Sequence, residues 1–419
     1  MSEKLIKKLK LTRQASLELR HAETLKKNAV LNSVAQVLSS VEKQNEILNA
    51  NKKDIKSLPK GTTPAFIDRL ALDKERIDLM AESLRQVSAL EDPLTGVQSR
   101  KLESGLILKR VPAPLGVILM IFESRPNVAI EGFGLAFKAG NAIILRGGRE
   151  SMGTTKVIYK IINEALVQND FSPDTVWGIT DPDRKLTSFL LKQKEYIDIV
   201  VPRGGPGLIK FVVENSPIPI IKNDRGLCHV YVHKDADLDM ALKIVFNSKT
   251  QRPSACNSME TVLVNRKIAT EFINQLYSLC LEKNVEWHVD SETLKILKKK
   301  PHVKLAKKED WNTEYLDQIM NCRIVDSYEE AVKHIENHGS RHSESIITKS
   351  EPLARKFQNE IDAAVVYWNA STRFTDGFEF GLGGELGIST QKLHVRGPVG
   401  LKELTSFRWV VDGTGQIRK

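Results

Sequence analysis

The sequence lacks any long apolar run. None of its hydrophobic stretches approaches the roughly 20 residues that a membrane-spanning helix requires. The basic N-terminal segment, MSEKLIKKLKLTRQ, is also not followed by the apolar core and cleavage site of a signal peptide. These absences argue against a membrane or secreted protein, so we expect a cytoplasmic chain with no membrane partner.

Cysteine is scarce and lacks the spacing of a metal-binding or redox pair. The four cysteines are Cys228, Cys256, Cys280 and Cys322, and no two of them form a C-x-x-C motif. A chain of 419 residues can bury a sizeable core without covalent cross-links. We therefore predict free thiols in a reducing compartment.

Histidine forms one suggestive run, HIENHGSRH, but the ligand set of a metal site is incomplete. His334, His338 and His342 are four residues apart, which on a continuous helix would place them on one face. Gly339 and Ser340 are expected to end that helix after His338, so His342 falls on a loop. No partner cysteine or carboxylate completes a set, and we predict no metal site.

Positive charge exceeds negative charge, with 62 Lys and Arg residues against 52 Asp and Glu residues and a net charge of +10. Nucleic-acid binding is one explanation of such an excess. Much of it lies in residues 294–310, LKILKKKPHVKLAKKED, a surface-like run without interleaved aromatic residues. An anionic substrate or cofactor explains the arginines elsewhere equally well, so we do not expect a nucleic-acid partner.

Length and composition predict a globular protein of two or three domains, since 41% of the residues are hydrophobic and 27% are charged. Residues 2–90 have a helical pattern. One helical face is formed by Val30, Val34, Val37, Leu38 and Val41.

From about residue 105, short apolar strands alternate with helices. The expected strands are 115–122, 141–148, 196–205, 218–222 and 229–233. Strands that are apolar almost throughout are typical of a parallel sheet with helices on both faces. A helix at 235–250 and a strand at 259–265 follow, and a second β/α region starts near Ile268. We therefore place a domain boundary near residue 240.

Two glycine-rich turns follow apolar strands, although neither has the G-x-G-x-x-G spacing of a dinucleotide fingerprint. In VVPRGGPGLIKF, Arg203, Gly204 and Gly205 precede a helix whose free N–H groups suit a phosphate. In NAIILRGGRE, Arg146 begins a turn where α/β folds bind ligands, and a basic residue there suits the 2′-phosphate of NADPH. A strand-to-helix turn without a ligand explains the first motif equally well, and a solvated arginine pair in a turn explains the second equally well.

Two loops are candidates for chemistry. QRPSACNSMETVLV, residues 251–264, contains Cys256 with Arg252 four residues before it, and a nearby cation favours the reactive thiolate. Taken alone, however, a cysteine is more often a buried structural residue. Residues 368–401 combine Arg373, Arg396 and seven glycines, which suits recognition of an anion, with a long irregular connection as the alternative.

Together these segments resemble the γ-glutamyl phosphate reductase family of the aldehyde dehydrogenase superfamily, from about residue 10 to the C-terminus. The motifs that carry the resemblance are IFESRPNV, GNAIILRGG, YIDIVVPRGG, CHVYV, TQRPSACNSMETVLV, AVKHIENHGSRHSESI and NASTRFTDGFEFGLGGELGISTQKLHVRGP. The resemblance implies an α/β, aldehyde dehydrogenase-like fold. Its expected parts are a Rossmann-type NADPH-binding domain (1–95 and 116–240), an α/β catalytic domain (241–395) and a small β oligomerisation flap (96–115 and 396–419).

The resemblance also implies a reaction, the NADPH-dependent reduction of L-glutamyl 5-phosphate to L-glutamate 5-semialdehyde and phosphate in proline biosynthesis. Cys256 would be the nucleophile that forms a thioester, and Asn127 would donate to the oxyanion. The expected cofactor-binding residues are Arg146, Gly147, Gly148, Arg203, Gly204, Gly205 and Glu314, and the expected substrate-binding residues are Arg125, Arg373 and Arg396. The expected protein partners are further copies in a homo-oligomer and, in a transient contact, glutamate 5-kinase.

One further absence discriminates between rival functions. Oxidative aldehyde dehydrogenases carry a general-base glutamate in an ELGGK segment, whereas this chain reads IKNDRGLCHVYV there. The absence counts against an aldehyde oxidiser, while a reductase of another acyl phosphate stays open. A catalytically inactive binding protein, the other rival, would be expected to lack the cysteine or the glycine turns, and both are present.

Overall fold

The structure, a computed structural model, describes residues 2–222, 225–298 and 300–418, and these form two compact units. Unit 1 comprises the chain up to residue 222, residues 381–387 and the chain from residue 398 onward. Unit 2 comprises residues 223–380 and 388–397. None of the helices in these ranges is both long enough and apolar enough to cross a membrane.

The N-terminal part of unit 1 is helical, as the sequence predicts. Its helices are α1 (Ser2–Leu19), α2 (Thr24–Leu38), α3 (Val41–Lys56), α4 (Pro64–Leu70) and α5 (Lys74–Ala89). The side chain of Ser40 accepts a hydrogen bond from the Lys43 amide and so begins α3. The prediction for Val41 is wrong, because this residue starts α3 instead of ending α2 and is 69% exposed.

Four parallel strands form the central sheet of unit 1, in the order β5-β4-β3-β6. The strands are β3 (Val117–Phe122), β4 (Ala142–Arg146), β5 (Val176–Ile179) and β6 (Ile199–Arg203), and the helices that follow them are α6 (Val128–Lys138), α7 (Met152–Gln168), α8 (Arg184–Leu190) and α9 (Pro206–Asn215). Unit 1 also contains the single-turn 3-10 helices η1 (Arg149–Ser151), η2 (Pro173–Thr175) and η5 (Lys402–Leu404). The 3-10 helices η3 (Asp310–Asn312) and η4 (Thr372–Phe374) belong to unit 2.

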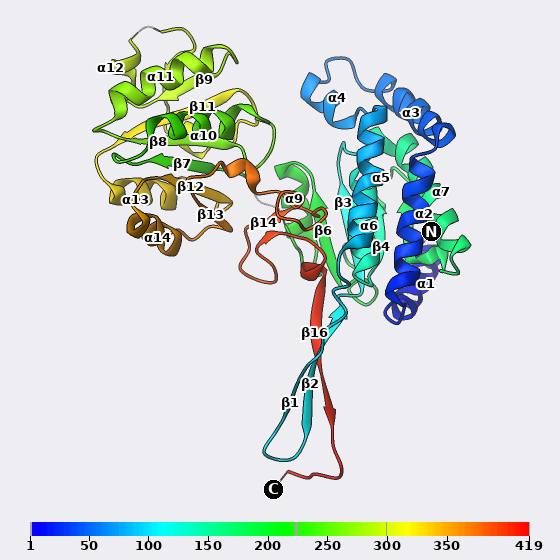
Figure 1. The fold of residues 1–419 in the computed structure, drawn as a ribbon. Helices are drawn as coiled ribbons and strands as arrows, with labels where there is room; N and C mark the ends of the chain where they lie inside the picture. The colour runs from blue at the N-terminus through cyan, green and yellow to red at the C-terminus, as the bar shows by residue number, and fades with distance from the viewer. Residues whose placement is uncertain (1, 223–224, 299, 419) are drawn as a thin grey trace. The chain divides into compact units, whose positions relative to one another are not determined.

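Helices cover both faces of this sheet, which explains why its strands are apolar almost throughout. Residues of α1, α8 and α9 pack on one face, and α6 packs against Met120 and Ile143 on the other, with α5 next to it (Figure 1). Of the predicted strand at 218–222, which lies wholly in the described part, only a bridge between Ile220 and Val200 forms.

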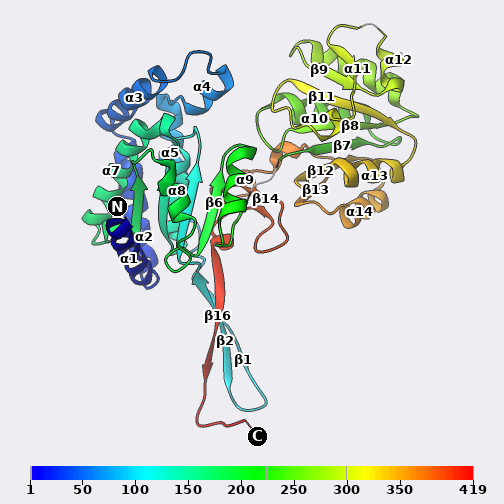
Figure 2. The ribbon, with the colours of Figure 1, turned by 180° about the vertical axis from the view of Figure 1, so that it is seen from behind.

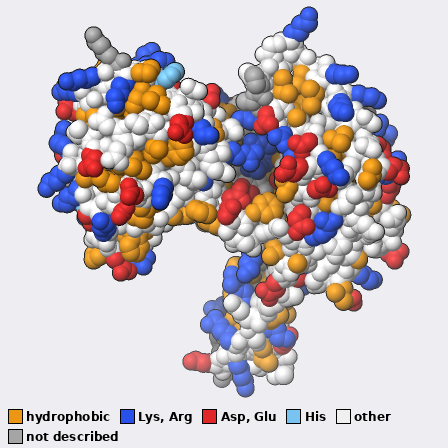
Figure 3. Space-filling view, turned by 45° about the horizontal axis from the view of Figure 1, so that its top comes forward, with side chains coloured by type: hydrophobic (Ala, Val, Ile, Leu, Met, Phe, Trp, Pro, Cys, Tyr) orange, Lys and Arg blue, Asp and Glu red, His pale blue; other side chains and the backbone are white. Residues whose placement is uncertain are grey.

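A three-stranded antiparallel sheet, which we call the flap, completes unit 1. Its strands are β1 (Gln98–Lys101), β2 (Ile107–Pro114) and β16 (Thr405–Asp412), in the order β1-β2-β16. Phe407, Trp409 and Val411 alternate along β16 and share one face, where each stays about half exposed at 46–54%. Hydrophobic side chains lie beside basic ones on the flap in Figure 3. This sheet falls within the segments predicted as the oligomerisation flap.

Unit 2 contains a seven-stranded parallel sheet in the order β10-β9-β11-β8-β7-β12-β13. The strands are β7 (Cys228–Val232), β8 (Met259–Asn265), β9 (Glu286–Val289), β10 (Val303–Leu305), β11 (Ile319–Val325), β12 (Ser343–Ile347) and β13 (Val365–Trp368). One face is covered by α10 (Leu238–Thr250), α11 (Ala269–Leu281) and α12 (Ser291–Leu297), and the other by α13 (Tyr328–His338) and α14 (Glu351–Glu360) (Figure 2). A short pair, β14 (Ile388–Ser389) and β15 (Gly397–Pro398), lies in the C-terminal loop.

The chain passes into unit 2 after residue 222, whereas the sequence placed the domain boundary near 240. The difference concerns β7, which was expected with the NADPH-binding domain but pairs with β8 and β12 in unit 2. Locally, β7 is an apolar strand like those of unit 1. Its pairing with β12, which begins more than 100 residues later, cannot be recognised from that local pattern.

Candidate active site

Cys256 lies in the loop between α10 and β8, at the amino end of the strands of unit 2. Its side chain is partly exposed, whereas the other three cysteines are buried. Burial raises the pKa of the Cys228 thiol well above its usual value and that of Cys280 to about 12. Cys256 is therefore the accessible thiol of the four.

The backbone of the Cys256 loop is held by short-range contacts. The Ala255 amide donates to the Arg252 carbonyl at 3.1 Å, and the Cys228 thiol donates to the Cys256 carbonyl at 3.4 Å. Gly226, in the segment before β7, packs against that same carbonyl. These contacts fix the peptide that carries the nucleophile candidate.

A buried ion pair lies beside this loop. Lys249, in the last turn of α10, bonds Glu260, the second residue of β8, at 2.9 Å, and both side chains are essentially unexposed. Burial raises the pKa of Glu260 to about 7 and lowers the pKa of Lys249. The sequence analysis did not single out either residue, because nothing local marks a charged pair as buried.

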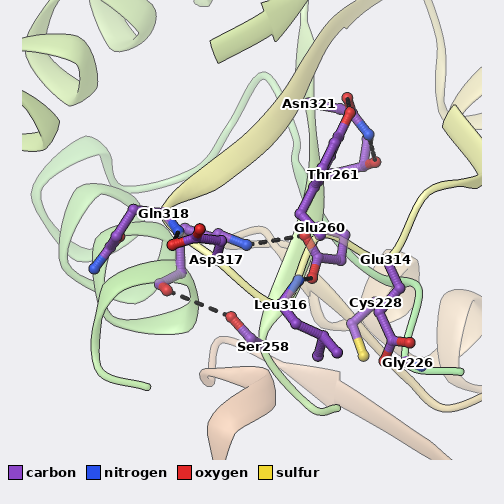
Figure 4. A network of polar contacts seen from close by, with 12 residues as sticks. Gly226, Cys228, Ser258, Glu260, Thr261, Glu314, Leu316, Asp317, Gln318 and Asn321 are labelled. Carbon is purple, nitrogen blue, oxygen red and sulfur yellow. Dashed lines mark hydrogen bonds and ion pairs between the residues drawn. The ribbon is translucent and has the colours of Figure 1, made fainter. Parts of the chain in front are cut away.

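Glu314, predicted to bind the cofactor, contacts Gly226, which itself packs against the loop that carries Cys256 (residues 251–258, called the nucleophile loop after the predicted role of Cys256). Its Oε1 accepts a hydrogen bond from the Gly226 amide at 2.8 Å. Two residues later, Leu316 adopts a left-handed φ of 54° and donates its amide to Glu260 at 3.3 Å. Figure 4 shows Gly226, Glu314, Leu316 and Glu260 gathered in this network. The buried pair thus anchors the turn that holds Glu314.

Arg373, predicted to bind substrate, also lies at the nucleophile loop. Its Nε donates to the Gln251 side chain at 2.8 Å, and its carbonyl accepts from Asn257 at 3.3 Å. Burial lowers the pKa of Arg373, and the charge of Arg252 lowers it further, while Cys256 raises it. The structure therefore brings Arg373 and Cys256 together within unit 2.

Arg396, the other predicted substrate residue of unit 2, lies in a separate cluster of charges. Its Nη1 bonds Asp362 at 2.7 Å, and the same carboxylate bonds Lys392 at 2.9 Å and Arg341 at 3.8 Å. The bonds from Lys392 and Arg396 lower the pKa of Asp362 to about 2. Three cations share one carboxylate here, so the cluster keeps a net positive charge.

Two histidines of the run, His334 and His342, are buried, and the His334 ring packs beside the rings of His229 and His338. Helix α13 ends at His338, so His342 lies outside it, as predicted. His229 pairs with Glu344 at 3.0 Å, and its ring lies 5.5 Å from that of His334. Burial lowers the pKa of His334 to about 2 and that of His342 to about 4, so both rings are neutral at physiological pH. Within the described ranges, no group of three His, Cys, Asp or Glu residues has the arrangement of a metal site.

Asn127 and Arg125 lie in the turn that begins α6 of unit 1. The Asn127 amide Nδ2 donates to Glu131 one helical turn later, at 2.7 Å. The carbonyl of Arg125 accepts the Val128 amide at 3.1 Å and so helps to start the helix. Both predicted residues are partly exposed, which leaves their side chains within reach of a ligand.

The strand order of unit 1 reverses at β3, because β4 and β5 lie on one side and β6 on the other. Ligands of open α/β sheets bind at the carboxyl ends of such neighbouring strands. Here β6 ends in Arg203, and the exposed Gly204 and Gly205 follow before α9 begins. Glu123, which sequence reasoning missed, accepts the Gly205 amide at 2.9 Å. The Glu123 carboxylate therefore already accepts the hydrogen bond that the Gly205 amide donates.

Arg146 ends β4 with its side chain turned back onto the protein. It is 7% exposed and donates to the carbonyls of Gly147 and Pro182. Burial lowers the pKa of its guanidinium. A Cβ at Gly147 would lie 3.2 Å from the Phe122 ring, and one at Gly148 would lie 2.1 Å from the Glu150 carboxylate. Close packing against the Phe122 ring therefore accounts for Gly147, whereas the Glu150 carboxylate beside Gly148 is the end of a flexible side chain that can rotate away.

Comparison with known proteins shows the family to which the chain belongs. Residues 3–294 match the model of the aldehyde dehydrogenase family. The chain is 46% identical to the γ-glutamyl phosphate reductase of Petrotoga mobilis over 100% of both chains. It is 47% identical to that of Halothermothrix orenii over 97% of this chain and 96% of the other. The crystal structure of γ-glutamyl phosphate reductase from Thermotoga maritima, 43% identical, superposes with a TM-score of 0.94 over 99% of this chain and 100% of its own.

Proposed function

Since this chain belongs to the γ-glutamyl phosphate reductase family of the aldehyde dehydrogenases, we propose that it reduces L-glutamyl 5-phosphate to L-glutamate 5-semialdehyde with NADPH. The reaction releases phosphate and serves proline biosynthesis. The observation that carries the proposal is the accessible thiol of Cys256 in a firmly held loop, within a chain similar to these reductases along its whole length.

The chemistry assigned to Cys256 has two stages. The thiolate attacks the carbonyl carbon of the acyl phosphate, the bond to the phosphate oxygen breaks with its electron pair, and a thioester remains. When NADPH is bound, it supplies a hydride to the thioester carbon, and the carbon–sulfur bond then breaks to give the aldehyde and the thiolate. For Asn127 we propose the role of donor to the oxyanion of both stages, with its Nδ2 exchanging Glu131 for that oxygen.

We propose that the glycine turn after β6 binds the nicotinamide dinucleotide. Gly204 and Gly205 are exposed at the start of α9, and the Gly205 amide already binds a carboxylate oxygen. We assign Arg203, Gly204 and Gly205 to the pyrophosphate, and Glu314 to the nicotinamide ribose. We assign Arg146, Gly147 and Gly148 to the adenosine ribose side, and we propose that the basic turn after β4 selects NADPH over NADH through the 2′-phosphate.

Three arginines are assigned to the anionic groups of the substrate. Arg373 is the foremost candidate for the phosphate, because it lies at the nucleophile loop. Arg396 and Arg125 are assigned to the remaining charge, with Arg396 supported by the net positive cluster around Asp362. Single variants of the three arginines test these assignments. A variant that raises the KM for the acyl phosphate without lowering kcat identifies an arginine that binds the substrate.

We further propose a cytoplasmic homo-oligomer that receives its substrate in a transient contact with glutamate 5-kinase. The half-exposed Phe407, Trp409 and Val411 on one face of the flap support self-association, since such a face is stabilised by a partner. Analytical ultracentrifugation tests this part, and a monomer at micromolar concentration would refute it.

The substrate is tested by following NADPH oxidation with γ-glutamyl phosphate generated in situ by the kinase. Aspartyl phosphate and acetylglutamyl phosphate are each tested in turn as alternative substrates. We expect NADPH oxidation with the glutamyl compound only. Turnover with another acyl phosphate alone would show that the assigned substrate is wrong. Cys256→Ser is expected to abolish turnover and to leave NADPH affinity unchanged, as measured by calorimetric titration.

A further inference from the structure

The short turn that carries Arg373 packs directly against the nucleophile loop. It consists of η4 and continues to Thr375. The side-chain amide of Asn257, the residue directly after Cys256, donates to the carbonyls of Thr375 at 2.8 Å and Arg373 at 3.3 Å. One carboxamide therefore joins two loops that lie 116 residues apart in the sequence.

A second contact holds the side chain of Arg373 to the same loop. Its Nε donates to Oε1 of Gln251 at 2.8 Å, and Gln251 is the C-cap residue directly after α10. Arg373 is thus anchored through its backbone by Asn257 and through its guanidinium by Gln251. Two anchors on one loop define where this cation lies.

The Asn257 side chain makes these bonds in an otherwise unfavourable setting. The residue is 3% exposed, and its Oδ1 accepts no hydrogen bond from the residues that the structure describes. A buried acceptor without a donor destabilises a fold. The favourable contribution of the Asn257 side chain to the fold therefore comes from the two hydrogen bonds that it donates to the Arg373 turn.

The position of Arg373 matters because its turn is bonded to Asn257, the residue directly after Cys256. Among the influences on the pKa of Arg373, burial and the neighbouring Arg252 lower it, whereas Cys256 raises it. An interaction that favours the charged guanidinium favours the thiolate by the same amount, since one energy is shared by both partners. The thiolate is the nucleophilic form of cysteine.

We infer that Asn257 is a positioning residue: it holds the Arg373 turn against the nucleophile loop and so keeps the Arg373 guanidinium near enough to Cys256 to favour the thiolate. The inference rests on the proposed function in one respect, that Cys256 is the nucleophile. Arg373 then has two uses, because the cation that favours the thiolate also lies where the substrate phosphate is expected.

Alkylation of Cys256 by iodoacetamide, followed across pH without substrate or cofactor, tests the inference. Arg373→Met and Asn257→Ala are each expected to slow alkylation at neutral pH by about threefold to tenfold and to move its pH midpoint upward. In the double variant the two effects do not multiply, because both act through the same guanidinium. Cys256→Ser gives the background from the three buried thiols.

Ser258→Ala is the matched control. Ser258 is also buried in this loop, but its hydroxyl donates to the Ser248 carbonyl at 3.1 Å and the Lys249 carbonyl at 3.4 Å, and not to the Arg373 turn. The control variant is expected to lower the thermal unfolding temperature and to leave the alkylation midpoint unchanged. Gln251→Met, at an exposed position, removes the other anchor. It should slow alkylation even if Asn257→Ala does not fold.

Three results would overturn the inference. They are normal alkylation in the folded anchor variants, effects that multiply in the double variant, and a shift in Ser258→Ala as large as that in Asn257→Ala. The last would reduce the effect to general loosening of the loop. A failure of the proposed function is seen separately, as absence of turnover with γ-glutamyl phosphate alongside the expected alkylation profiles.

Discussion

Gly226 lies so close to Cys256 that a Cβ on the glycine would stand 1.6 Å from the Cys256 carbonyl oxygen. The obstruction is backbone, which cannot rotate away as a side chain can. The Gly226 amide also donates to Glu314, so the same glycine touches the Cys256 loop and a predicted cofactor residue. A residue without a side chain is therefore required here by packing alone.

Gly226→Ala is the first prediction that follows. The added methyl group must push the Cys256 peptide aside, and we expect alkylation of Cys256 and NADPH turnover to fall at least about tenfold, with a stability loss of about 1–3 kcal/mol from overpacking. The alkylation rate and urea unfolding measure the two effects. The rates should fall further than the loss of stability explains, since the folded fraction at 25 °C stays high.

Gly207→Ala is the control for this substitution. A Cβ at Gly207 meets no described atom within 4 Å, and this glycine lies in a helix, where alanine is favourable. The control should alkylate like the unmodified chain. If Gly226→Ala alkylated normally as well, the close approach of Gly226 to Cys256 would have no consequence for the thiol.

The sequence predicted many of the features that depend on neighbouring residues. The periodicity of apolar residues in 2–90 predicted helices, and the apolar run of β3 predicted a buried strand. Both predictions succeed because the spacing of apolar residues along the chain shows which side chains are buried. Pro206 and Gly339 marked a helix start and a helix end correctly. The prediction of Cys256 as the nucleophile came from the resemblance to a family, since its local pattern favoured a buried thiol.

The rest depends on contacts between distant segments, which local patterns do not record. Asn257 meets Arg373 across 116 residues, and Glu123 meets Gly205 across 82. The general rule for α/β sheets points to the carboxyl ends of strands, yet Cys256 lies at the amino end of β8. The site of unit 2 therefore could not be placed by that rule.

The buried Lys249–Glu260 pair makes a second prediction, a dependence of stability on pH. Burial raises the pKa of Glu260 from 4.5 to about 7, so the folded protein holds a proton between these pH values that the unfolded chain releases. Stability should therefore decrease as pH rises through this window, by about 3 kcal/mol at most for this group. Urea unfolding at intervals from pH 4.5 to 7.5 measures the slope.

Glu260→Gln is expected to remove that decrease. Gln resembles the protonated Glu260 that Lys249 faces below this window, so the variant should match the unmodified chain near pH 4.5 and exceed its stability by about 3 kcal/mol at most near pH 7.5. Glu351→Gln, which breaks an exposed pair with Arg355, should cost less than about 1 kcal/mol and keep the slope. A slope that survives in Glu260→Gln would assign the titration to another group.

The third prediction concerns Glu123, whose carboxylate bonds the Gly205 amide at the turn assigned to the cofactor pyrophosphate. An incoming pyrophosphate must displace this carboxylate and approach its negative charge. Glu123→Gln keeps the size of the side chain and removes the charge, so NADPH should bind about threefold to tenfold more tightly at low salt. The gain should shrink as salt is added, because this turn is exposed.

Calorimetric titration of NADPH at two salt concentrations checks the effect, with Glu164→Gln as a control that removes an equal charge from an exposed helix pair on α7. The control should leave affinity unchanged, which separates a local effect at the turn from the net charge of the chain. Weaker binding by Glu123→Gln would mean that the carboxylate helps to shape the turn more than it repels the ligand. Equal binding by the two variants would place the pyrophosphate away from Gly205, because a charge directly at its site cannot be neutral in energy.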